Sequence, residues 1–119
     1  MVHALEEIRR VLVPQGVLID LRPLPGQRMV EMTSERNQQQ IGWLTDLPVE
    51  MTDTEAANTA LRTAIRRGWF IRESELNFPF FFYWDTPEEM RQYIKEEWSD
   101  FTVMQDDLFL AVQSAWETA

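Results

Sequence analysis

The chain has 119 residues, which is enough for one domain with a single core, and 45% of them are hydrophobic. This composition predicts a folded protein and excludes a disordered one. The net charge of −9 excludes nucleic acids and anionic membranes as expected partners, because both bind basic surfaces. Cysteine is absent, which excludes disulfides, and no apolar stretch suits a membrane span or a signal peptide. We therefore expect residues 1–119 to form a single cytoplasmic domain.

The start of the chain predicts a helix, a turn and a strand, in that order. Apolar residues recur at helical spacing over residues 2–12. Pro14 ends this helix because proline cannot continue the hydrogen-bond ladder, and Gly16 accepts a positive φ in the turn. Residues 17–21 are almost continuously apolar, which is typical of a strand covered on both faces in a parallel sheet. Together these elements predict an αβ unit of the doubly wound type.

The same segment resembles a known family. Residues 4–19 follow the pattern ALxEIxRVLxPxGxLI, which is similar to a late helix-and-strand segment of class I S-adenosylmethionine-dependent methyltransferases. The resemblance implies a Rossmann-like sheet with a substrate cleft at the end of the strand over residues 17–21. It also implies S-adenosylmethionine as the cofactor of the full-length family. It covers the C-terminal half of such an enzyme.

The half of the family fold that holds the cofactor is not recognisable in these residues. In the resembled enzymes a Gly-rich loop cradles the methionine part of the cofactor, and an acidic residue after the next strand holds the ribose. The four glycines, Gly16, Gly26, Gly42 and Gly68, lie at least ten residues apart, so a GxGxG-like loop is absent. We therefore expect a fragment that binds no cofactor alone and has no catalytic residues of its own.

The next segment predicts a half-exposed antiparallel hairpin. Residues 29–33 and 40–44 alternate between apolar and other residues, and the polar residues 34–39 lie between them as a loop. Residues 46–53, which include Pro48, are expected to form a linker.

A second helix is predicted after this linker. Thr52 and Glu55 have the spacing of a capping box, although Asp53 or Thr54 could also be the cap. The apolar face that follows is rich in alanine, and Gly68 closes the helix.

The last third of the chain predicts a strand and two further helices. Residues 69–76 predict a strand that continues past Pro79 into residues 80–84, with the second part at a sheet edge or bent, because proline lacks an amide donor. Thr86 followed by Pro-Glu-Glu predicts a capped helix start, and a last helix begins at about Gln105. The apolar positions predicted to be buried in these two helices are Met90, Tyr93, Ile94, Trp98, Leu108, Ala111, Val112, Ala115 and Trp116.

These elements predict an α/β or α+β fold: a partial Rossmann-like methyltransferase sheet with a short antiparallel hairpin and about four helices. In the resembled enzymes a further strand follows the final helix and lies beside the segment equivalent to residues 17–21. Without that neighbour an apolar strand edge is exposed, and such edges associate. We therefore expect a homodimer through the sheet edge or the aromatic strand, or a partner that supplies the cofactor-binding half.

Two pairs of residues are candidates for substrate binding. Asp20 and Arg22 follow the predicted strand at its C-terminal end, where open α/β sheets bind ligands, although a simple salt bridge is the plainer interpretation. Phe82 and Trp84 belong to the aromatic run of residues 78–84. One face of that run could line an apolar pocket, or it could fill the core or a dimer seam.

No residue is predicted to act in catalysis or to bind a metal. His3 is the only histidine and is expected to be a surface residue, because no Ser, Cys or carboxylate accompanies it at motif spacing. Adjacent carboxylates on a helix do not face each other, so helix caps and solvated faces explain the acidic pairs. These pairs are Glu88-Glu89, Glu96-Glu97 and Asp106-Asp107.

The functional prediction is a methyltransferase-like C-terminal fragment that is non-catalytic alone. It would be the substrate-side or assembly half of a split or truncated enzyme. The alternative is a small-ligand-binding or protein-interaction module that uses the aromatic strand over residues 78–84.

Overall fold

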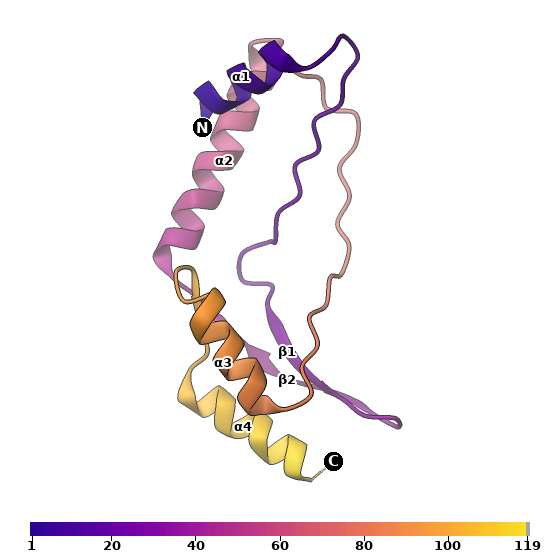
Figure 1. Ribbon diagram of the computed structural model, residues 1–119, viewed down its shortest axis with the longest axis vertical. Coiled ribbons are helices and arrows are strands. Elements are labelled where there is room, and N and C mark those ends of the chain that lie inside the picture. The colour runs from indigo at the N-terminus through magenta and orange to yellow at the C-terminus, as the bar shows by residue number, and fades with distance from the viewer. Residues whose placement is uncertain (119) are drawn as a thin grey trace. The chain divides into compact units, whose positions relative to one another are not determined.

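The computed structural model describes residues 1–118, which form four α-helices and two antiparallel two-stranded sheets. The fold mixes helices and strands, as the predicted α+β class requires (Figure 1). The elements are α1 (Val2–Val11), β1 (Met29–Thr33), β2 (Gln38–Trp43), β3 (Thr45–Asp46), α2 (Pro48–Arg66), α3 (Pro87–Glu97), β4 (Thr102–Val103) and α4 (Asp106–Glu117).

The chain folds as two compact units. The α1 unit comprises Met1–Arg22 and Thr52–Phe80, and the hairpin unit comprises Pro23–Met51 and Phe81–Ala119. Each unit has its own cluster of buried hydrophobic residues. The single domain expected over residues 1–119 stays a prediction.

Strands β1 and β2 form the predicted hairpin in the hairpin unit. β2 begins at Gln38, two residues earlier than expected, and its register with β1 shifts after Val30. The connecting loop is closed by Ser34, whose amide donates to the carbonyl of Asn37 at 2.8 Å. Its hydroxyl donates to the same oxygen at 3.3 Å, so a short polar turn fixes the hairpin. β3 pairs with β4 in a second antiparallel sheet.

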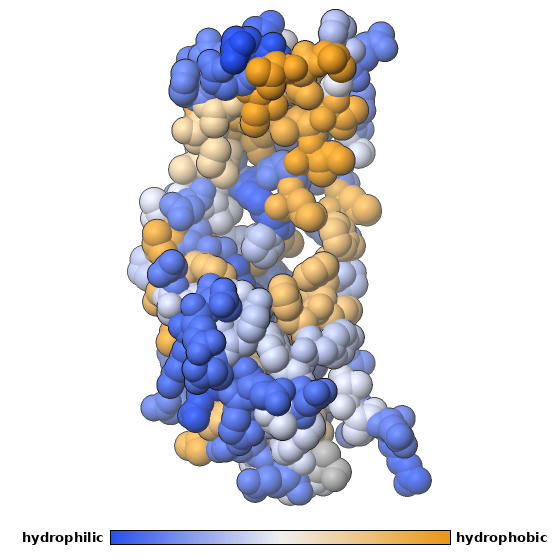
Figure 2. Space-filling view, in the orientation of Figure 1, coloured by the Kyte–Doolittle hydropathy of each residue, from blue (hydrophilic) through white to orange (hydrophobic). Residues whose placement is uncertain are grey.

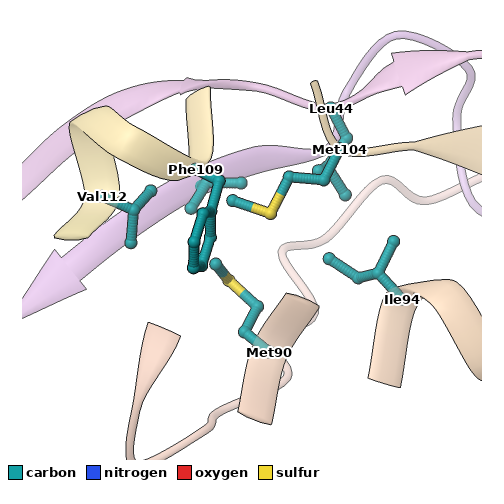
Figure 3. Close-up of a cluster of buried hydrophobic side chains, with 7 residues drawn as sticks. Leu44, Met90, Ile94, Met104, Phe109 and Val112 are labelled. Atoms are coloured by element: carbon teal, nitrogen blue, oxygen red, sulfur yellow. The ribbon is translucent and has the colours of Figure 1, made fainter. Parts of the chain in front are cut away.

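The core of the hairpin unit is built from strand and helix residues. Phe109 of α4 is 4% exposed and Ile94 of α3 is 2% exposed. Figure 3 shows the ring of Phe109 between Val112 and Met104, with Met90 pointing toward it from α3. Burial of each large side chain stabilises the fold by about 1.5–3 kcal/mol. The cluster consists of Val30, Leu44, Met90, Ile94, Met104, Phe109 and Val112.

The buried face of α4 differs from the predicted one. Val112 and Ala115 are buried as expected, but Ala111 and Trp116 are exposed. Phe109, which the sequence interpretation left out, is buried instead. The helix is therefore rotated so that its i, i+3, i+6 positions face the core. In α3, Met90 and Ile94 are buried as expected, Trp98 packs against the core, and Tyr93 stays 37% exposed.

The predicted start of α3 is confirmed. The Thr86 hydroxyl accepts a hydrogen bond from the Glu89 amide at 3.2 Å, and Pro87 occupies the first turn. Threonine at this position satisfies one of the amide donors that a helix start leaves unpaired. Proline is tolerated beside it because its missing donor would have no partner there.

An ion-pair cluster around Arg28 holds the hairpin unit together at a second place. The guanidinium donates to Asp46 Oδ1 at 2.5 Å and to Glu50 Oε1 at 2.9 Å. The Gly26 amide also donates to Asp46, and the guanidinium lies 5.0 Å from the ring centre of Phe101. These contacts join the turn before β1 to the first turn of α2. All three charged side chains are at most 15% exposed.

In the α1 unit, α1 packs against α2 through small side chains. Leu5 of α1 is 6% exposed, and Ala60 and Ala64 of α2 are 2% and 0% exposed. These three side chains form one buried cluster. The partly buried hydrophobic residues around them are Val2, Ile8, Leu18, Leu61, Trp69 and Phe70.

The linker predicted over residues 46–53 is wrong. Helix α2 already begins at Pro48, so this proline starts a helix instead of interrupting one. The resulting helix is the longest of the described chain, at 19 residues. No helix within residues 1–118 is long and apolar enough to cross a bilayer.

The predicted end of α2 at Gly68 is confirmed. Gly68 has a φ of +79°, and its amide donates to the carbonyl of Ile65 at 3.0 Å. The Trp69 amide donates to the carbonyl of Ala64 at 3.0 Å. This pair of bonds is a Schellman motif, in which a left-handed residue satisfies the last carbonyls of the helix.

The turn after α1 is present, but Gly16 is not the residue with the predicted positive φ. The residue with a positive φ, +67°, is Gln15. Gly16 donates its amide to the carbonyl of Val13 at 2.8 Å. A Cβ atom on Gly16 would lie 2.9 Å from that carbonyl oxygen, so glycine is needed there for close approach.

The buried parallel strand predicted over residues 17–21 is wrong. The segment lies outside all described strands, and Val17, Ile19 and Leu21 are 67%, 81% and 73% exposed. Leu18 alone packs against the buried cluster of the α1 unit. An apolar run favours burial but does not supply the neighbouring strands that a sheet needs.

The strands predicted over residues 69–76 and 80–84 are also absent. Ile71 and Leu76 are 87% and 79% exposed, and no strand is described between α2 and α3. Figure 1 draws this connection, and the one after α1, as long stretches without arrows. Both stretches have strand-like composition without a strand partner.

Candidate functional site

Asp20 and Arg22 form the salt bridge that the plainer interpretation predicted. Arg22 Nε donates to both carboxylate oxygens of Asp20, at 3.0 and 2.9 Å. Arg22 Nη2 also donates to Asn58 Oδ1 of α2 at 2.8 Å. The guanidinium is thus held by groups of its own α1 unit, and its side chain is 33% exposed. A ligand would have to compete with these bonds.

Phe82 and Trp84, the other predicted pair, lie together in an aromatic cluster of the hairpin unit. Their rings are stacked, with centroids 6.0 Å apart and planes 15° apart. Trp98 meets both rings edge-on, at 5.1 and 5.9 Å. Tyr93 lies 5.5 Å from Trp84 and 5.6 Å from Trp98. Aromatic pairs at such distances attract each other beyond the area they bury.

A shallow depression of about 470 Å³ lies beside this cluster. Its aromatic part is formed by Trp84 and Tyr93, and its polar part by residues along the length of α3. The residues that line it are Trp84, Glu88, Glu89, Gln92, Tyr93 and Glu96. Three carboxylates beside two aromatic side chains make a surface suited to a positively charged group. Asp20 and Arg22 belong to the α1 unit and do not line it.

The carboxylate of Glu88 is stabilised in its charged form. The side-chain amide of Gln113 in α4 donates to Glu88 Oε1 at 3.0 Å. This hydrogen bond is the main reason why the pKa of Glu88 is lowered from its ordinary value of 4.5. A backbone hydrogen bond and the charge of Arg91 lower the pKa further, and desolvation opposes them. Glu88 is therefore ionised at neutral pH.

The sequence interpretation missed Tyr93 and the acidic rim as parts of one site. Glu88, Gln92 and Glu96 recur at i, i+4 spacing, which places them on one side of α3. Glu89 and Tyr93 follow the same spacing one residue later. That spacing could have been read from the sequence, but the position of Trp84 beside this face depends on tertiary packing.

His3 and the three acidic pairs lie at the surface. The His3 side chain is 83% exposed, and its Nδ1 lies 4.0 Å from a carboxylate oxygen of Glu6. Within residues 1–118 no group of histidines and carboxylates is arranged to hold a metal ion. Asp106 and Asp107 lie in the first turn of α4, where carboxylates interact favourably with the helix dipole.

Comparison with family models, curated proteins and solved structures finds no match for this chain. The methyltransferase resemblance of residues 4–19 therefore stays a prediction.

Proposed function

We propose that this chain is the C-terminal, substrate-side half of a methyltransferase-like fold, a cytoplasmic assembly module that binds no S-adenosylmethionine alone. The observation that carries the proposal is the state of residues 17–21. This segment has the sequence of a buried central strand, but three of its five side chains are at least two-thirds exposed. A segment of this kind is completed when neighbouring strands from another part of the fold cover it.

The roles of the glycines support the same proposal. Gly26 and Gly68 have positive φ values in a turn and at a helix end. Gly16 allows a close backbone contact, and a Cβ atom on Gly42 would lie 2.8 Å from Leu108 Cδ1 of α4. Three glycines thus serve local backbone geometry and Gly42 serves packing against α4, and the four are spread over both units. A phosphate- or nucleoside-binding loop instead needs several glycines within a few residues.

Isothermal titration with S-adenosylmethionine tests this proposal. We expect no saturable heat at ligand concentrations up to roughly 1 mM, which corresponds to binding weaker than about −4 kcal/mol. S-adenosylhomocysteine, which lacks the sulfonium charge, serves as the second ligand and should behave in the same way. Saturable micromolar binding of either nucleoside would contradict the proposal.

A second candidate function is supported by the depression beside Trp84 and Tyr93. Its two rings and three carboxylates favour a small organic cation, which gains from ring faces and from opposite charge. This would make the hairpin unit a ligand-binding module, with or without a methyltransferase-like assembly.

Titration with benzyltrimethylammonium, followed by the indole N–H signals in NMR spectra, tests this candidate. We expect a saturable shift for Trp84 and none for Trp69, which lies in the α1 unit and is the internal control. Glu89→Gln should weaken binding because it removes one negative charge from the depression. Equal, non-saturating shifts of both indoles would rule the candidate out.

A further inference from the structure

Residues 17–21 present two different sides. Val17, Ile19 and Leu21 are 67%, 81% and 73% exposed, whereas Leu18 packs against the buried cluster of the α1 unit. In an extended chain alternate side chains point to opposite sides, so the three exposed residues share one side. Figure 2 shows apolar side chains gathered on the surface of the α1 unit, where its extended segments run.

The backbone of this segment is also free to pair. Among residues 1–118, none of the amides or carbonyls of residues 17–21 takes part in a backbone hydrogen bond. The Asp20 and Arg22 side chains bond to each other, and Arg22 also bonds to the Asn58 side chain. They do not occupy the backbone groups of residues 17–21. An open row of donors and acceptors beside apolar side chains is a template for another strand.

The distribution of charge indicates which strand fits. The α1 unit contains seven acidic and seven basic residues, so its net charge is zero. The hairpin unit contains thirteen acidic and four basic residues and carries the whole charge of −9. Two copies can therefore meet through their α1 units without net repulsion, whereas two hairpin units would repel each other.

We propose that residues 17–21 pair antiparallel with the same residues of a second copy, around a two-fold axis at Ile19. In this register Val17 lies opposite Leu21 of the other copy, and Ile19 lies opposite its own counterpart. A shift by two residues would place an apolar residue opposite Gln15 or Pro23, and proline offers no amide to the ladder. The self-complementary contact closes as a dimer. The inference rests on the proposed assembly role and names the partner as a second copy.

A single introduced cysteine tests the pairing, because the natural chain has none. Directly opposite residues of an antiparallel pair have Cβ atoms about 4.5–5.5 Å apart, close to the separation in a disulfide. We expect Ile19→Cys to form a disulfide-linked dimer on mild oxidation. Leu110→Cys in the hairpin unit and Ile71→Cys in the same α1 unit are matched controls, because both side chains are also exposed. Both controls should stay monomeric on a non-reducing gel.

Light scattering of the unmodified chain and of Ile19→Lys gives the second readout. We expect the unmodified chain at dimer mass and Ile19→Lys at monomer mass, because two lysines would meet at the axis. The side chain is exposed, so the circular dichroism spectrum should not change. A monomeric unmodified chain, or equal crosslinking of all three cysteine variants, would overturn the pairing. Binding of S-adenosylmethionine by the dimer would contradict the proposed function and leave the pairing intact.

Discussion

A single hydrogen bond from Gln113 of α4 favours the charged form of Glu88 of α3, at the edge of the aromatic depression. The amide of Gln113 donates to the Glu88 carboxylate at 3.0 Å and is the largest cause of its lowered pKa. A carboxyl group whose pKa is lowered by folding stabilises the folded state at pH values above its pKa in the unfolded chain. This contribution is lost as the pH falls through the pKa in the folded state.

We predict that Gln113→Ala raises the pKa of Glu88 toward 4.5, because the main stabilising hydrogen bond of the carboxylate is removed. The stability difference between the two proteins should be present at pH 6 and shrink below pH 4.5. Carboxyl ¹³C NMR titration measures the pKa, and urea unfolding at several pH values measures stability. Gln92→Ala, which removes an amide bonded to Glu96 instead, is the control. An unchanged Glu88 pKa in Gln113→Ala would refute the assignment.

At the same scale, sequence patterns predicted several residues correctly because their roles are local. Thr86 caps α3 through an amide three residues ahead, and Gly68 ends α2 within one turn. Arg28 was missed, because its partners Asp46 and Glu50 lie 18 and 22 residues away. Nothing in the spacing of these three charges distinguishes them from surface residues.

Among the elements, the helices followed their sequence patterns and the isolated strands did not. A helix satisfies its backbone hydrogen bonds within itself, so the pattern over residues 2–12 was enough to predict α1. The hairpin was predictable for a related reason, because its two arms are neighbours in sequence. Residues 17–21 and 69–76 have no such local partner, and both are extended and largely exposed.

The end of α2 provides the prediction at this scale. We expect Gly68→Ala to destabilise the chain by about 1–2 kcal/mol, because a Cβ atom is strained in the left-handed conformation. Gly68→Asn should lose less stability, because asparagine tolerates the left-handed conformation. Urea unfolding followed by circular dichroism measures both. A Cβ atom there would meet no other atom within 4 Å, so equal losses for the two variants would contradict this explanation.

For the whole molecule, the net charge of −9 is distributed unequally between the two units. The α1 unit is neutral and exposes Val17, Ile19 and Leu21, whereas the hairpin unit carries the excess of carboxylates. The hairpin unit buries a connected cluster of seven residues, and the α1 unit buries only three. A small core with exposed apolar segments is the property expected of an assembly surface.

The sequence by itself determined the start of α3, the end of α2, the hairpin and the absence of a Gly-rich loop, because each depends on residues close together in the chain. Only the tertiary structure decided which side of α4 is buried and which groups surround Arg28. It also brought Trp84 to Tyr93 and left residues 17–21 without a paired strand. These outcomes depend on contacts between distant segments. An apolar pattern shows that a surface favours burial, but it does not say which surface will cover it.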